Sequence, residues 1–71
     1  MSGNTYGVSE IVGTSEESLS DAISNGIARA SRTVRNLDWF EVTGVRGYIR
    51  DNAVNHFQVQ MKVGFRIEDA G

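Results

Sequence analysis

The chain has 71 residues, of which 39% are hydrophobic and 23% charged, and its formal net charge is −2. This composition is typical of one folded domain and excludes a disordered or membrane-spanning chain. A chain of this length buries only about 60% of the surface that its unfolded form exposes. It has no cysteine for a disulfide and only one histidine, so a histidine cluster that could bind a metal is absent from the sequence. We therefore expect residues 1–71, as a single domain, to gain stability by packing against copies of themselves.

The net charge and the hydropathy of the chain limit the kinds of partner that we expect. The acidic balance argues against nucleic acid, because binding a phosphate backbone normally requires a basic surface. No apolar run reaches the length of a transmembrane helix or a signal-peptide core, so we expect a cytoplasmic protein without a membrane partner. We expect residues 1–4 and 68–71, which are small or polar, to be flexible.

Residues 5–12 predict a first strand that ends at Gly13. The next four residues, Thr14 to Glu17, match a capping box, in which the Thr14 hydroxyl accepts from the Glu17 backbone N–H. We therefore expect a helix to begin here.

Small and apolar residues recur every three or four positions between residues 19 and 34, which predicts one amphipathic helix. This stripe consists of Leu19, Ala22, Ile23, Gly26, Ile27, Ala30 and Val34. The glycine within it predicts a close approach between the helix and a strand.

Residues 37–50 and 53–67 predict two long strands joined by a tight turn at Asp51-Asn52. The second strand alternates strictly between apolar and polar positions, so its apolar face should lie under the helix. The apolar positions are Phe57, Val59, Met61, Val63, Phe65 and Ile67, and the alternate positions are His56, Gln58, Gln60, Lys62, Gly64 and Arg66.

The apolar face of residues 37–50 changes parity between Val42 and Val45. A β-bulge at Gly44 would restore the register and turn Phe40, Val42, Val45 and Ile49 toward the helix. The opposite face then carries Trp39, Glu41, Thr43, Arg46, Tyr48 and Arg50.

Trp39 is the only tryptophan, and a single tryptophan in a small domain is more often a core residue than a ligand platform. The alternation of residues 37–50, with a bulge at Gly44, places Trp39 on the uncovered face with Gln58, Arg46 and Arg66. This position favours an interface or ligand role. An exposed indole can stack on an aromatic ligand. A glutamine amide can pair with a ring edge that bears carbonyl and N–H groups, and arginine suits phosphate.

The chain resembles the dodecins, a family of small flavin-binding proteins, over nearly its whole length. The resemblance depends on several short strings that occur in order and at matching distances. They are Val12-Gly13-Thr14-Ser15, Ala28-Arg29-Ala30-Ser31, Arg35-Asn36-Leu37-Asp38-Trp39-Phe40-Glu41-Val42, His56-Phe57-Gln58-Val59 and Lys62-Val63-Gly64-Phe65-Arg66.

The resemblance implies an α+β fold of β-α-β-β order, in which a three-stranded antiparallel sheet packs on one amphipathic helix and the chain assembles into a hollow homododecamer. Trp39 would stack on the isoalloxazine ring, opposite a symmetry-related copy, and Gln58 would bond its polar edge. Arg46 and Arg66 would suit the phosphate of FMN, and Asp38 lies beside the tryptophan. Riboflavin and FAD are alternative ligands, and coenzyme A is a candidate for another site.

The implied function is flavin storage, buffering and photoprotection without catalysis. The alternative is a structural shell, or a small nucleic-acid-binding or anion-binding oligomeric module, without flavin. Little favours an enzyme, because the single histidine, His56, is expected to be a surface or interface side chain, and neither a paired-carboxylate site nor a glycine-rich phosphate loop is recognisable.

Overall fold

The structure is a computed structural model that describes residues 3–68. Its elements follow the order β1 (Tyr6–Ser15), α1 (Leu19–Ala30), β2 (Leu37–Arg50) and β3 (Ala53–Arg66), which confirms the predicted β-α-β-β fold. The expectation of flexible ends falls partly on residues 1–2 and 69–71, which lie outside the described residues.

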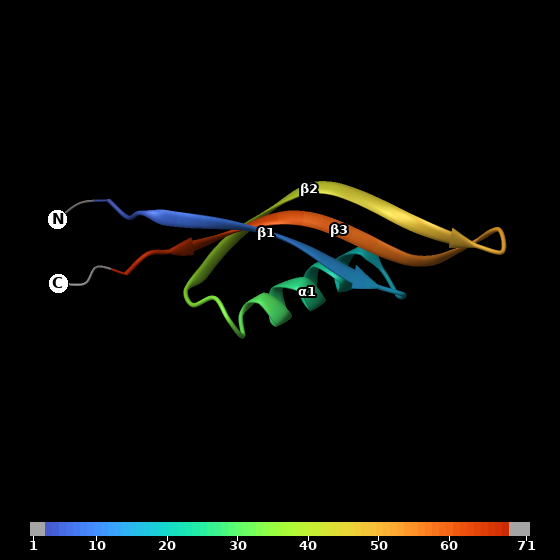
Figure 1. Cartoon of the computed structure of the whole chain (residues 1–71), viewed down its shortest axis with the longest axis horizontal. Helices are drawn as coiled ribbons and strands as arrows, with labels where there is room; N and C mark the ends of the chain where they lie inside the picture. The colour runs from blue at the N-terminus through green and yellow to red at the C-terminus, as the bar shows by residue number, and fades with distance from the viewer. Residues whose placement is uncertain (1–2, 69–71) are drawn as a thin grey trace.

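The three strands form one antiparallel sheet in the order β1-β3-β2, so the last strand in the sequence is central. β3 pairs along its length with both neighbours, and the β2–β3 hairpin extends beyond the N-terminal end of the helix (Figure 1). The helix lies against one face of the sheet, and we call the opposite face the outer face.

The core is small and lies between α1 and β3. Alternate residues of β3 point toward the helix, as their period-two pattern predicted, and Val59, Met61 and Val63 are fully buried against Ala22 of α1. Partly buried apolar residues extend this cluster: Ile11, Ile23, Ile27 and Leu37.

The helix approaches β1 closely through two glycines. A β-carbon built on Gly26 would lie 3.2 Å from the Gly13 Cα and 3.1 Å from the Met61 Cε, and one built on Gly13 would overlap the Ala22 carbonyl oxygen. The expectation that Gly26 permits close packing of a strand is therefore confirmed.

The predicted start of the helix was wrong. Thr14 and Ser15 remain in β1, paired with Gln58 and Phe57, and Ser18 is the N-cap, whose Oγ accepts from the Asp21 N–H at 3.0 Å. Ser15 stabilises this turn because its hydroxyl donates to the Asp21 carboxylate at 2.7 Å. Continued pairing with the long strand β3 therefore overrides the local capping signal.

The helix also ends earlier than its apolar stripe suggested. Ala30 is its last residue, and Val34 lies in the turns that follow, where its N–H donates to the Ala30 carbonyl at 3.0 Å. Asn36 then takes a left-handed conformation, with φ of 66°, and the chain enters β2.

Both backbone predictions for the hairpin were right. Asp51 and Asn52 have φ of 55° and 63°, the left-handed pair that a two-residue hairpin turn of type I′ requires. The β2–β3 register shifts between Val42 and Gly44, as a bulge at Gly44 predicts, and further shifts occur near both ends of β2.

The helix covers less of the sheet than expected. Phe40, Val42 and Val45 do share the side of Val63, Met61 and Val59, their partners on β3. Within the described residues, however, no Cα of α1 lies within 8 Å of a Cα of β2. These three side chains and Ile49 are 41–75% exposed.

No helix in residues 3–68 is long and apolar enough to cross a membrane. The cytoplasmic location stays a prediction.

Candidate functional site

The sheet register places four of the five candidate residues on the outer face. Trp39 pairs with Gly64, Arg46 pairs with Gln58, and Arg66 pairs with Tyr6 of β1, all at positions that alternate with the buried residues of β3. The prediction that Trp39 lies on the face opposite the helix is confirmed. Asp38, the fifth candidate, is the extra residue where the register shifts between Leu37 and Trp39.

Trp39 forms an indole platform at one end of this face. A β-carbon built on Gly64 would overlap the Cε2, Cζ2 and Nε1 atoms of the indole, so the ring occupies the space above the central strand that a side chain would fill. The residue remains 42% exposed. The indole thus packs on the backbone at Gly64, and part of its surface remains accessible.

A tyrosine and an aspartate flank the indole platform. The Tyr6 ring lies 6.5 Å from the Trp39 ring, centroid to centroid, at a tilt of 56°, which is a favourable arrangement for two aromatic rings. The Tyr6 hydroxyl donates to Asp38 Oδ2 at 3.0 Å. Asp38 therefore fixes Tyr6 beside the indole, a role that the sequence did not indicate.

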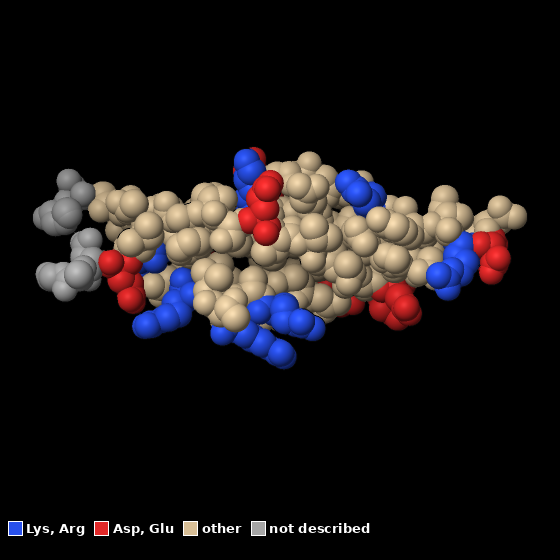
Figure 2. All heavy atoms as spheres, in the orientation of Figure 1, with Lys and Arg blue, Asp and Glu red and all other residues tan. Residues whose placement is uncertain are grey.

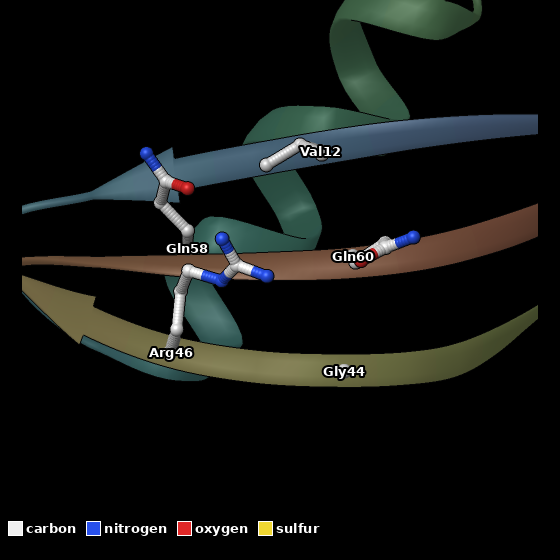
Figure 3. A pocket seen from close by; sticks show the side chains of 5 residues that line it. All are labelled: Val12, Gly44, Arg46, Gln58 and Gln60. Atoms are coloured by element: carbon white, nitrogen blue, oxygen red, sulfur yellow. The ribbon is translucent and has the colours of Figure 1, made fainter.

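Arg46 and Gln58 form a second polar site toward the other end of the outer face. Arg46 extends from β2 over β3, and Gln58 points from β3 toward β1, so that both side chains line a pocket of about 80 Å³ (Figure 3). Gln60, Val12 and Gly44 complete this amide–arginine pocket. A guanidinium beside a primary amide offers donors for an anion and both a donor and an acceptor for a heterocycle edge.

His56 lies next to this pocket, two positions before Gln58 on the same strand. Its Nε2 lies 3.4 Å from Gln58 Nε2, its Nδ1 lies 2.8 Å from Asn55 Nδ2, and its ring stacks on Tyr48 at 4.7 Å. The period-two pattern already placed His56 on the face of Gln58, but nothing in the sequence indicated a role for it there.

The two sites are well separated within one chain. Trp39 lies over Gly64, six positions along β3 from Gln58, which corresponds to about 20 Å at the rise of a β-strand. Glu41 and its partner Lys62 lie between them. Arg66 lies at the same end of the outer face as Trp39, and Arg46 lies at the same end as Gln58.

Basic side chains on the remaining surface lie mainly near the end of the helix. In Figure 2, Lys and Arg groups gather along the lower edge, below the helix, whereas acidic groups are dispersed. Arg29 lies in the last turn of α1, and Arg32 and Arg35 follow soon after it in the chain. All three are exposed, and Arg35 pairs with Glu68 at 3.8 Å. In residues 3–68, no group of three or more His, Asp or Glu side chains is placed to hold a metal ion.

Comparisons with known proteins agree with this architecture. The family model described as Dodecin matches residues 5–68. A dodecin of Thermus thermophilus is 51% identical over 67 residues, which cover 94% of this chain and 97% of that protein.

Solved structures give the same result. The dodecin from Streptomyces davaonensis has a TM-score of 0.92 at 57% identity, over 96% of this chain and 100% of the other. The dodecin from Streptomyces coelicolor has a TM-score of 0.91 at 54% identity, over 99% of this chain and 100% of the other. The chain therefore belongs to the dodecin family.

Proposed function

We propose that the protein binds flavin, preferably FMN, and serves in flavin storage, buffering and photoprotection rather than in catalysis. The observation that carries the proposal is the indole platform, where Trp39 lies over Gly64 on the outer face and keeps 42% of its surface exposed. Dodecins are flavin-binding proteins, and stacking between an indole and an isoalloxazine ring contributes about 0.5–1.5 kcal/mol beyond the burial of area.

The separation of the two sites supports a ligand site that is shared between copies of the chain. Trp39 would stack on the ring and Gln58 would bond its edge, yet they lie about 20 Å apart in one chain, farther than three fused rings can span. One flavin can meet both residues only if they come from different subunits. A twofold axis would then bring two Trp39 rings to either side of a flavin pair.

Uncovered apolar surface supports self-assembly. A groove of about 510 Å³ between α1 and β2 is lined by Ile23, Ile27 and Phe40 among other residues. On the outer face, Val8 and Val12 of β1 are more than half exposed. A 71-residue chain with a core of four buried apolar residues gains stability if other copies cover these surfaces, and a closed dodecameric shell would do so.

The preference for FMN depends on the arginines. Arg46 lines the pocket beside Gln58, and Arg66 lies near the indole platform, so each end of the outer face has a cation for a phosphate. Riboflavin would retain the contacts of the flavin ring but lose the contact between arginine and phosphate. FAD would require room for its adenylate. Coenzyme A would occupy a site of its own.

Two measurements test the proposal. The first is an absorption spectrum recorded across the size-exclusion peak, which should show flavin bands that coelute with an oligomer. The second is titration with FMN, which should quench flavin fluorescence in the native chain and lose most of its affinity in Trp39→Ala. Uptake that is weak and unchanged by the substitution contradicts the proposal. A purely structural shell predicts an assembly that takes up no FMN. A nucleic-acid-binding or anion-binding module that uses the same arginines, Arg46 and Arg66, predicts an assembly that binds polynucleotides more tightly than FMN.

A further inference from the structure

Both ring nitrogens of His56 face a side-chain amide. Nδ1 lies 2.8 Å from the Asn55 amide nitrogen, and Nε2 lies 3.4 Å from the Gln58 amide nitrogen. The ring is partly buried and stacks on Tyr48 with an interplanar angle of 11°. Gln58 therefore has a hydrogen-bonding partner on the sheet in addition to the open pocket.

The chemistry of imidazole limits how these amides can be oriented. A neutral ring has one N–H donor and one acceptor nitrogen, so it cannot accept from both amide NH₂ groups. One of the two amides must present its oxygen to the ring. A protonated ring donates from both nitrogens, so both amides must then present oxygen. The protonation state and the tautomer of His56 together determine which atom Gln58 turns toward the ring.

We propose that His56 is a positioning residue for ligand recognition, because its state sets the orientation of the Gln58 amide. This inference builds on the proposed flavin function. In the neutral form that we assign, the Asn55 amide is turned so that its oxygen accepts from Nδ1–H, and Nε2 accepts from Gln58 Nε2. Gln58 Oε1 then remains available to accept from an N–H on the polar edge of a ring. When His56 is protonated, Nε2 donates, Gln58 turns its oxygen to the imidazole, and the ligand N–H loses its acceptor.

The side chains around His56 allow its effect to be isolated. On the outer face, β2 contributes Tyr48 and Arg46, and β1 contributes Thr14, the partner of Gln58. Phenol and guanidinium groups do not normally change charge between pH 5 and 8, whereas histidine does. His56 is also the only histidine in the chain, so no second imidazole contributes to a change in ligand affinity over this range.

The test uses riboflavin, which has no phosphate, so that the attraction of arginine to an anion does not enter. Dissociation constants from fluorescence quenching are measured between pH 5.5 and 8 for the native chain, His56→Gln and His56→Leu. The affinity of the native chain should fall about tenfold toward pH 5.5, the size expected for loss of one hydrogen bond in a closed site. His56→Gln, which keeps a polar neighbour that does not titrate, should bind without a pH step, and His56→Leu should bind weakly at every pH.

The outcomes separate this inference from the proposed function. Riboflavin binding that is independent of pH in the native chain, or a pH step that persists in His56→Gln, overturns the role of His56 and leaves flavin binding intact. No binding by the native chain at any pH overturns both. If His56→Leu does not assemble, as judged by size exclusion, the comparison of the native chain with His56→Gln decides. Nitrogen NMR gives an independent readout, because the imidazole should be the Nδ1–H tautomer near pH 8, and an Nε2–H tautomer contradicts the proposal.

Discussion

The indole of Trp39 lies over Gly64, its partner on β3, and fills the space in which a side chain of the central strand would stand. Because Gly64 of β3 has no β-carbon, the Trp39 ring of β2 can lie directly over it. The relationship connects a local sequence choice in the sheet to the surface that we propose for flavin.

Gly64→Ala should displace the indole, because the added β-carbon would overlap three of its ring atoms. We expect FMN affinity to fall about tenfold or more, equivalent to about 1.4 kcal/mol. The emission of Trp39 should also shift in the ligand-free protein, since no other tryptophan contributes. Gly47→Ala is the matched control, because its new β-carbon would meet only the His56 carbonyl oxygen at 3.8 Å. Equal FMN affinity of the two variants would show that the space above Gly64 does not matter for binding.

Arg46→Ala and Arg66→Ala should each weaken FMN binding more than riboflavin binding. A charge-assisted hydrogen bond to phosphate contributes about 1.5–3 kcal/mol, so a loss of about tenfold or more is expected for FMN alone. Parallel titrations with the two ligands, repeated at high salt, measure the difference, which salt should reduce. If both ligands are affected alike, the arginines do not read the phosphate.

Phe40→Asp should impair assembly, because Phe40 is 49% exposed and lines the apolar groove between α1 and β2. Burial of a phenylalanine side chain contributes about 1.5–3 kcal/mol, which is lost once for each copy of the interface. Light scattering at several protein concentrations should show smaller species for this variant and native size for Phe40→Leu. Native assembly by Phe40→Asp would mean that the groove faces solvent in the oligomer.

Ser18→Ala should destabilise the protein by about 1 kcal/mol, because the N-cap of α1 loses the acceptor for the Asp21 N–H. Thr14→Ala should cost less than about 0.5 kcal/mol, since Thr14 is an exposed residue of β1. Urea denaturation at one fixed protein concentration compares them, because the stability of an oligomer depends on concentration. The reverse order would restore Thr14 as the helix cap.

Much of the fold followed from periodicity. The strict alternation of β3, the turn residues at Asp51 and Asn52, and the parity change at Gly44 together predicted the hairpin and the face of Trp39. The helix boundaries failed for a physical reason. Thr14 and Glu17 match a capping box in isolation, but the backbone of Thr14 and Ser15 pairs with β3. Pairing partners far away in the sequence are not visible in a local motif.

The candidate site was only partly accessible to sequence reasoning. Alternation put Gln58, Arg46 and Trp39 on one face, but it could not show that about 20 Å separates the first two from the third. Tyr6 was missed because its contact with Asp38 requires β1 and β2 to lie on either side of β3. Gly64 carried a visible signal, as the one glycine among the polar alternate positions of β3 from His56 to Arg66.

The central place of β3 has a consequence for synthesis. β1 and β2 are not neighbours in the sheet, so neither has a strand to pair with until residues 53–66 have been made. The sheet therefore cannot begin to form on the ribosome while the chain is still growing through β2, and the β1–β3 contacts, which are distant in sequence, depend on the last residues of the sheet. A truncation within β3 should shorten both ladders at once, whereas a loss at an edge strand would affect only one.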